Sequence, residues 1–188
     1  MDLIGRSQAG DEEAWADLFE RYKNLVYKTA YLMLGSAAEA EDALQQVFLR
    51  AFRSLSGFEP RRGAFATWLH RLTVNHCFNR RRRRRFLLLS LDEVSPSALV
   101  DDSPSPGARL EEGAAVQQAF GGLSDKQRAV VILRYYWEMP YAEIARVLAM
   151  PLGTVKSRLN LALRILRREL GTLAQDAPGA LSQRGAVR

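Results

Sequence analysis

Cysteine and histidine are nearly absent from this chain of 188 residues, which holds one cysteine, Cys77, and two histidines, His70 and His76. One cysteine cannot form a disulfide within the chain, and these three residues lack the spacing of metal ligands. The sequence also lacks the Gly-x-x-x-x-Gly-Lys-Ser/Thr loop that cradles phosphates and the Gly-x-Ser-x-Gly elbow that presents a nucleophile. We therefore expect neither an enzyme nor a bound cofactor or metal ion.

Long apolar runs are missing as well. No stretch approaches the ~20 consecutive apolar residues that span a bilayer, and the N-terminal stretch MDLIGRSQAGDEEAW lacks the apolar centre of a signal peptide. We therefore expect a cytoplasmic protein. Hydrophobic residues still make up 47% of the chain, which is enough for a packed core. Because strong helix formers dominate and alternating β-branched residues are scarce, the sequence predicts an all-α fold.

The net charge of +6 is unevenly distributed along the chain. Residues 1–85 carry a net charge of +5, residues 86–112 carry −5, and residues 113–188 carry +6. Because Lys and Arg neutralise phosphates, two basic segments predict two contacts with nucleic acid. The acidic segment between them is rich in Ser, Pro and Asp and cannot bury much apolar surface.

The chain should therefore form two small helical domains joined by a flexible acidic linker. We expect the first domain over residues 8–86, the linker over 87–106, the second domain over 107–171 and a disordered tail over 172–188. In the first domain, apolar residues at steps of three and four predict helices over residues 11–34 and 37–55, and this spacing places Phe52 in the core. Ser36 and Glu39 have the spacing of a capping box.

Residues 141–170 predict two helices joined by a tight turn. Pro151 should end the first helix, and Thr154 is a suitable N-cap for the second. The second helix has an apolar stripe on one side, and residues 146–168 contain six basic residues and no acidic one. A helix-turn-helix presents such a face to the major groove of DNA. The alternative is an ordinary helical hairpin with a solvated basic face.

Nine arginines and no acidic residue lie between residues 60 and 85, including six consecutive arginines at 80–85. Aromatic residues are interleaved with them or lie just before them. Cations beside rings suit single-stranded or melted DNA, because cations follow phosphates while rings stack on unpaired bases. The alternative is that the rings belong to the core and only the arginines contact DNA. We favour this alternative for Trp68 and leave both interpretations open for Phe58 and Phe65.

These two blocks, in this order across an acidic linker, resemble bacterial RNA polymerase sigma factors of the small extracytoplasmic-function (ECF) type. The polymerase-binding helix of their region 2 is similar to AEDALQQVFLRAFRSL, and their promoter-melting helix is similar to WLHRLTVNHCFNRRRR. Their region 4 resembles LSDKQRAVVILRYYWEMPYAEIARVLAMPLGTVKSRL. The resemblance covers about residues 11–170 and implies a protein that binds core RNA polymerase and directs it to promoters. An anti-sigma factor is a further partner that the resemblance implies.

The resemblance also implies roles for individual residues. Region 4 would read the −35 element as duplex through Thr154, Lys156, Ser157, Arg158, Asn160, Arg164 and Arg167. Region 2 would read the −10 element as a separated strand through Phe58, Arg61, Arg62, Phe65, Asn75, His76, Asn79, Arg80, Arg81 and Arg82. Core polymerase would bind the helix face formed by Asp42, Gln45, Gln46, Leu49 and Arg50. The linker carboxylates Asp92, Glu93, Asp101 and Asp102 would mimic nucleic acid in a basic channel of the polymerase.

Four residues depart from the family pattern. Ala149 stands where a turn glycine is usual, so a left-handed backbone there costs about 1 kcal/mol or is avoided. Gln46 and Asn79 replace common acidic residues, and Leu161 replaces a frequent basic one. A stand-alone helix-turn-helix regulator is the alternative function, but it leaves the first basic block unexplained. A recombinase-like enzyme would need a nucleophile or metal site that the sequence does not offer.

Overall fold

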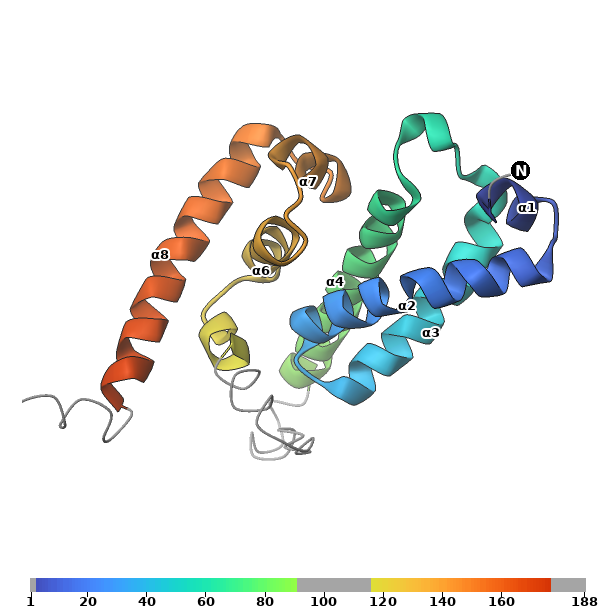
Figure 1. The fold of residues 1–188 in the computed structure, drawn as a ribbon. Helices are drawn as coiled ribbons and strands as arrows, with labels where there is room; N and C mark the ends of the chain where they lie inside the picture. The colour runs from blue at the N-terminus through green and yellow to red at the C-terminus, as the bar shows by residue number, and fades with distance from the viewer. Residues whose placement is uncertain (1–2, 91–115, 177–188) are drawn as a thin grey trace, which may run out of the picture.

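The computed structural model describes residues 3–90 and 116–176, and every regular element among them is helical (Figure 1). This confirms the all-α fold class. The helices are α1 (Leu3–Gln8), α2 (Glu12–Leu34), α3 (Ala37–Ser54), α4 (Phe65–Ser90), α6 (Asp125–Val131), α7 (Tyr141–Val147) and α8 (Leu152–Asp176), with 3-10 turns η1 (Leu55–Gly57) and η2 (Pro60–Arg62) and a π-helical segment η3 (Ile132–Tyr136). Residues 116–121 are also helical.

Two groups of helices make up the molecule, which we call the N-terminal unit (α1 to α4) and the C-terminal unit (residues 116–176). In the N-terminal unit, α2, α3 and α4 pack on one another, and α1 closes one end against α2 (Figure 1). In the C-terminal unit, α6 and α7 both pack against the long α8. No helix in the described ranges is long and apolar enough to cross a membrane.

Local sequence signals explain several helix ends. Asp11 caps α2 by accepting the N–H of Ala14, and Gly35 ends the helix with a left-handed φ of 84°. Ser124 and Gln127 form a complete capping box at the start of α6. At α3, Ser36 accepts the N–H of Glu39, as the sequence predicts.

The other half of the predicted box at α3 is replaced by ion pairs. The Glu39 carboxylate lies 3.3 Å from Arg80 and 3.8 Å from Arg84, both on α4. A guanidinium is a stronger partner for a carboxylate than a backbone amide, so tertiary contacts override the local motif here.

Two predicted boundaries differ from the observed helix ends. Helix α4 continues to Ser90, past the expected domain end at residue 86, and α8 continues to Asp176, into the expected tail. Residues 91–115 and 177–188, which include most of the predicted linker and tail, lie outside the described residues. The four linker carboxylates and the predicted start of the helix at residue 107 are therefore outside them too.

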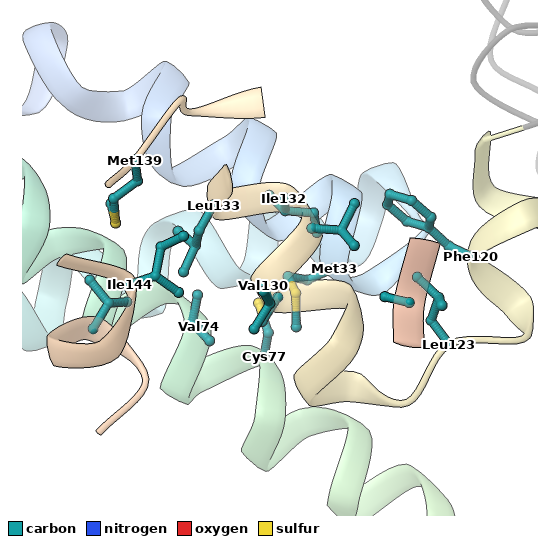
Figure 2. Packing of buried hydrophobic residues seen from close by; sticks show 14 of the residues in the cluster. Met33, Val74, Cys77, Phe120, Leu123, Val130, Ile132, Leu133, Met139 and Ile144 are labelled. Atoms are coloured by element: carbon teal, nitrogen blue, oxygen red, sulfur yellow. The ribbon is translucent and has the colours of Figure 1, made fainter. Parts of the chain in front are cut away.

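The buried core has two parts. One lies within the N-terminal unit and is built around Leu18, Val47, Phe48 and Leu69. The other is shared by both units, because Met33, Val74 and Cys77 of the N-terminal unit lie beside Val130, Leu133 and Ile144 of the C-terminal unit (Figure 2). The two units are therefore packed on one another, an arrangement that the sequence did not predict.

Candidate nucleic-acid interface

Helices α7 and α8 form the helix-turn-helix that the sequence predicts. After α7, the N–H of Ala149 donates to the carbonyl of Arg146 at 3.4 Å, and the N–H of Met150 donates to the carbonyl of Ala145 at 3.0 Å. This pair of hydrogen bonds is a Schellman motif, which requires a left-handed residue at position 149. Ala149 adopts that conformation with φ of 48°, so the turn keeps the left-handed backbone at the cost of steric strain on the alanine Cβ.

The predicted N-cap of α8 is wrong. The helix begins at Leu152, and the N–H groups of Thr154 and Val155 donate to the carbonyl of Pro151 at 2.9 and 3.1 Å. Thr154 therefore lies inside the first turn, with its side chain partly buried. Pro151 therefore occupies the N-cap position through its backbone carbonyl, three residues before Thr154.

Helix α8 has a buried side and a free side. Val155, Leu159 and Ala162 are at most 2% exposed and face the core. Exposed side chains are carried by Lys156, Ser157, Asn160, Arg164 and Arg167. At 100° per residue these five fall within an arc of about 100°, so they form one surface. Among the described residues, the enclosed Nε of Arg158 has no hydrogen-bond partner, and its side chain is partly buried.

Phe58, in the loop before α4, and Phe65, the first residue of α4, belong to the core. Phe58 is 7% exposed and Phe65 is 3% exposed, with their ring centroids 5.4 Å apart. The side-chain amide of Gln8 ties this loop to α1 by donating hydrogen bonds to the carbonyls of Leu55 at 2.9 Å and Phe58 at 2.8 Å. Neither ring is free to stack on a base in this conformation, so their burial favours the core interpretation over the stacking interpretation.

Trp68 reaches a cavity of about 440 Å³ beside this loop. Its ring packs 5.2 Å from Phe58 and 5.3 Å from Phe65 but remains partly exposed. The cavity is lined by Gly57, Phe58, Glu59, Gly63, Ala64, Thr67, Trp68 and Arg71 of the N-terminal unit and by Arg146 and Val147 of α7. An aromatic ring and an arginine, Trp68 and Arg71, therefore lie together at this cavity. The partly exposed ring is that of Trp68, whereas the sequence left stacking open for Phe58 and Phe65.

The other residues predicted to contact the −10 strand are distributed along this side of the N-terminal unit. Arg61, Asn75 and Asn79 are exposed, and the side chain of Arg62 is outside the described set.

Four of the six arginines at 80–85 form ion pairs within the molecule, two of them with α3. Arg80 pairs with Asp42 and Glu39 of α3, and Arg84 lies 3.8 Å from Glu39. Arg82 is exposed. The guanidinium of Arg80 therefore has two carboxylate partners in this conformation, and its role in binding DNA stays a prediction.

Arg81 and Arg85 pair with the C-terminal unit. Arg81 Nε and an Arg85 guanidinium nitrogen each donate to the Asp125 carboxylate at 2.5 Å. Arg81 also donates to the carbonyl of Met33 at 3.0 Å. Arg81, predicted to contact DNA, is engaged by the protein itself in this conformation.

A second cavity, of about 500 Å³, lies between α3 and α4. It is lined by Asp42, Gln46, Leu49, Arg50, Arg53, His76, Asn79, Arg80 and Arg83. Residues predicted separately for polymerase and for the −10 strand therefore meet at one cleft. Burial lowers the pKa of His76, whose enclosed Nε2 has no hydrogen-bond partner among the described residues.

The outer face of α3 carries the residues predicted to bind polymerase. Gln45, Gln46, Leu49 and Arg50 are exposed, while Asp42 is partly buried by its pair with Arg80. Phe52 lies on this face too, with 57% of its surface exposed and its ring 5.2 Å from Trp15. Its placement in the core was wrong.

No group of three or more His, Cys, Asp or Glu side chains in residues 3–90 and 116–176 is arranged to hold a metal ion.

Comparison with known proteins identifies both units. The Sigma-70 region 2 family model matches residues 18–86, and the Sigma-70, region 4 family model matches residues 113–166. Over 180 residues the chain is 34% identical to the ECF RNA polymerase sigma factor SigW of Bacillus subtilis, covering 90% of this chain and 96% of SigW. This chain belongs to the ECF sigma factors. It is also 35% identical over 173 residues to the ECF sigma factor SigM of Mycobacterium tuberculosis, covering 92% of this chain and 85% of SigM.

Two solved structures share the fold of this sigma factor. CnrH, solved in complex with the cytosolic domain of CnrY, matches with a TM-score of 0.67 and 23% identity over 93% of this chain and 97% of CnrH. RpoE of Bartonella quintana, solved with the anti-sigma factor NepR, matches with a TM-score of 0.66 and 22% identity over 82% and 97%. At these identities the likeness shows the fold alone.

The interface between the two units of this sigma factor is polar as well as apolar. Arg128 is 4% exposed and donates to the carbonyl of Met33 at 3.0 Å. Trp137 Nε1 donates to Thr29 Oγ1 at 2.9 Å, and Thr67 donates to Glu143. No periodicity in the sequence marks these pairs, since the members of each are 76 to 108 residues apart.

Proposed function

We propose that this ECF sigma factor binds core RNA polymerase, directs it to specific promoters and promotes initiation by reading two promoter elements in two physical forms. The C-terminal unit reads the −35 element as duplex, and the N-terminal unit reads the −10 element as a separated strand. The observation that carries the proposal is that one chain holds both a helix-turn-helix with a free polar face and an aromatic cavity beside arginines. A stand-alone regulator has no use for the second feature.

In the C-terminal unit, α8 enters the major groove. Lys156, Ser157 and Asn160 reach base edges, because they lie on the exposed side within the first three turns of the helix. Arg164 and Arg167 continue the same surface and neutralise phosphates. The partly buried Thr154 and Arg158 support this face at its edge.

In the N-terminal unit, the cavity beside Trp68 holds an unpaired base of the −10 strand. Trp68 supplies a ring face for stacking, and Arg71 supplies a cation for a neighbouring phosphate. Unstacking a base costs a few kcal/mol, which electrostatic attraction by the exposed Arg61 and Arg82 offsets.

Core polymerase binds the exposed face of α3. Gln45, Leu49 and Arg50 provide an apolar and polar mixture there, and Phe52 adds an exposed ring. The relatives are RNA polymerase sigma factors by name, which supports this partner. An anti-sigma factor is a further partner, supported by the name of NepR in the second solved complex. We place the sigma factor in the cytoplasm, with its polymerase and promoters, and assign it no catalytic site of its own.

Run-off transcription with a purified bacterial core polymerase and a promoter library tests this proposal. The wild-type chain should initiate at a subset of promoters, and Lys156→Ala or Asn160→Ala should lower initiation there by about 5- to 150-fold, corresponding to about 1–3 kcal/mol per lost base contact. Lys126→Ala is the matched control, because Lys126 is an exposed lysine that belongs to α6 and not to the predicted DNA-reading face of α8. Absence of specific initiation at every promoter would falsify the proposal, and tight duplex binding without polymerase would favour a stand-alone regulator.

A further inference from the structure

The cleft between α3 and α4 is a cavity to which the proposed function assigns no ligand. It encloses about 500 Å³, within the range of about 300–1,000 Å³ that is typical of small-molecule sites. Four of its nine lining residues are arginines and only one is a carboxylate, so its walls are strongly basic. Helix α3 contributes Asp42, Gln46, Leu49, Arg50 and Arg53, and α4 contributes His76, Asn79, Arg80 and Arg83.

Most of the positive charge in this cleft is uncompensated. Arg80 pairs with Asp42, the one carboxylate of the lining. Within residues 3–90 and 116–176, no carboxylate lies at ion-pair distance from Arg50, Arg53 or Arg83. Each guanidinium offers five N–H donors in a planar fork that matches phosphate oxygens, so these three arginines favour an anion with several such oxygens.

His76 records the positive potential of the cleft. Burial lowers its pKa, and the charges of Arg80, Arg50 and Arg83 lower it further, against an opposing effect of Asp42. Its enclosed Nε2 has no hydrogen-bond partner in the part of the chain that the structure describes. An enclosed polar atom without a partner is unfavourable, so a ligand that provides one gains from this contact.

The remaining lining indicates the class of anion. Gln46 and Asn79 provide amide donors from opposite walls, and none of the lining residues is an aromatic ring on which a base could stack. Unpaired arginines lie on both walls, with Arg50 and Arg53 on α3 and Arg83 on α4. A chain of linked phosphates can contact both walls together, whereas a single phosphate group offers only one tetrahedron of oxygens.

We propose that the α3–α4 cleft binds a small oligophosphate anion, with two or more linked phosphate groups, and that this anion competes with core polymerase for α3. Leu49 and Arg50 line the cleft and also belong to the face of α3 that the proposed function assigns to polymerase. The competition therefore rests on the proposed function. Binding of the anion itself does not.

Isothermal titration calorimetry of the full chain with inorganic tripolyphosphate, at low salt and without polymerase, tests the site. Arg83→Gln should weaken binding about three- to tenfold, since it removes the unpaired cation of the α4 wall. Arg21→Gln is the matched control, because it removes the same charge from an exposed arginine of α2 that does not line the cleft. The control should change the affinity by less than about twofold.

The chain has two histidines, so the imidazole Cε1–H signals in a proton NMR spectrum report where the anion binds. Tripolyphosphate should shift the signal of His76 and leave that of His70, which is buried against Trp137 and does not line the cleft. Sodium sulfate at matched ionic strength should shift neither. Equal shifts of His76 with sulfate, or equal tripolyphosphate affinities of Arg83→Gln and Arg21→Gln, would mean general charge screening and overturn the site.

Two further measurements fix the ligand and its effect. Tripolyphosphate should weaken binding of a labelled chain to core polymerase more for Arg21→Gln than for Arg83→Gln, which no longer holds the anion well. Equal inhibition of the two variants would overturn the competition. A fluorescein-labelled single-stranded DNA 20-mer tests the other source of phosphates: if Arg83→Gln loses affinity for the 20-mer but none for tripolyphosphate, the cleft binds the DNA backbone and the small ligand is wrong.

Run-off transcription separates this inference from the proposed function. If the wild type initiates at promoters while tripolyphosphate leaves the His76 signal in place, the oligophosphate site is wrong and the sigma function stands. If tripolyphosphate shifts His76 and Arg83→Gln weakens its binding while no promoter is transcribed, the site is supported and the proposed promoter function is wrong.

Discussion

At the scale of a single residue, Ala149 has the strained left-handed backbone that its position in the turn predicts. It sits at the left-handed position of the turn between α7 and α8, with φ of 48°. Replacing it with glycine removes the Cβ strain, so Ala149→Gly should raise the free energy of unfolding by about 1 kcal/mol in urea denaturation.

Ala145→Gly provides the opposite control in the same helix. Ala145 lies within α7, where glycine is a poor helix former, so this change should lower the free energy of unfolding by about 1 kcal/mol. If both substitutions destabilise the chain equally, the turn does not strain Ala149.

His70 couples stability to pH through its burial. It is 3% exposed, with Nδ1 3.5 Å from Thr29 Oγ1 and its ring against Trp137, and burial lowers its pKa from 6.5 to about 4. As the pH falls below about 6.5, the unfolded chain takes up a proton at His70 that the folded chain refuses. The free energy of unfolding should therefore fall by up to about 1.4 kcal/mol per pH unit, until the pH approaches 4.

Urea denaturation at about pH 7.5 and about pH 5 measures this loss, which should be roughly 2 kcal/mol for the wild type. His70→Gln removes the titrating group and should reduce the difference between the two pH values. The same pH difference in wild type and variant would assign the effect to other groups, such as the half-buried His76.

At the scale of an element, α3 has one face that packs in the core and one face that is exposed and is proposed to bind polymerase. Phe48 is 5% exposed in the core, whereas Phe52, one turn later, is 57% exposed. Phe48→Ala should lower the free energy of unfolding by about 3–5 kcal/mol, because it leaves a cavity. Phe52→Ala should cost about 1 kcal/mol, the value of its ring contact with Trp15.

Phe52 should matter more for binding to core polymerase than for stability. Exposed aromatic side chains at protein interfaces often carry more than 1 kcal/mol of binding energy, so Phe52→Ala should weaken binding of a labelled chain to core polymerase at least about fivefold. Unchanged polymerase affinity for Phe52→Ala, measured at a temperature where the variant is folded, would remove this ring from the interface.

The same helix shows how far periodicity predicts these elements. The apolar spacing predicted α2 and α3 nearly to the residue, because both are stripes buried on one side. Phe52 was misplaced because it lies about 40° from Phe48 around the helix, at the edge of the stripe, where a neighbouring element decides burial. Thr154 and Glu39 were misassigned for a related reason: a backbone carbonyl and two arginines were better partners than the local motif.

At the scale of the whole molecule, the sequence predicted two units and a separate DNA-binding surface on each. Packing of the units on one another depends on pairs far apart in the chain, such as Arg128 with Met33 and Asp125 with Arg81. Each of these residues has an ordinary local role, so no motif reveals its partner. The sequence therefore predicted arginines available to DNA, whereas in the structure four of the six arginines at 80–85 form ion pairs with carboxylates of the same chain.

Two buried threonines test the interface between the units. Thr29 and Thr73 are both 0% exposed, and each donates its hydroxyl to the carbonyl four residues earlier. Thr29 alone also accepts the indole N–H of Trp137 from the other unit, at 2.9 Å. Thr29→Val should therefore lower the free energy of unfolding by about 1–2 kcal/mol more than Thr73→Val, because it leaves the indole N–H without its acceptor.

Urea denaturation followed by tryptophan fluorescence and by circular dichroism measures both variants on the same chain. The excess cost should shrink when Trp137 is replaced by Phe, since Trp137→Phe removes the donor and leaves the 3.5 Å contact with His70 Nδ1 as the remaining difference between Thr29 and Thr73. Equal costs for Thr29→Val and Thr73→Val in the presence of Trp137 would mean that the hydrogen bond across the interface adds nothing to stability. The packing of the two units on one another would then depend on the apolar contacts of Met33 and Leu133 and on the ion pairs of Asp125.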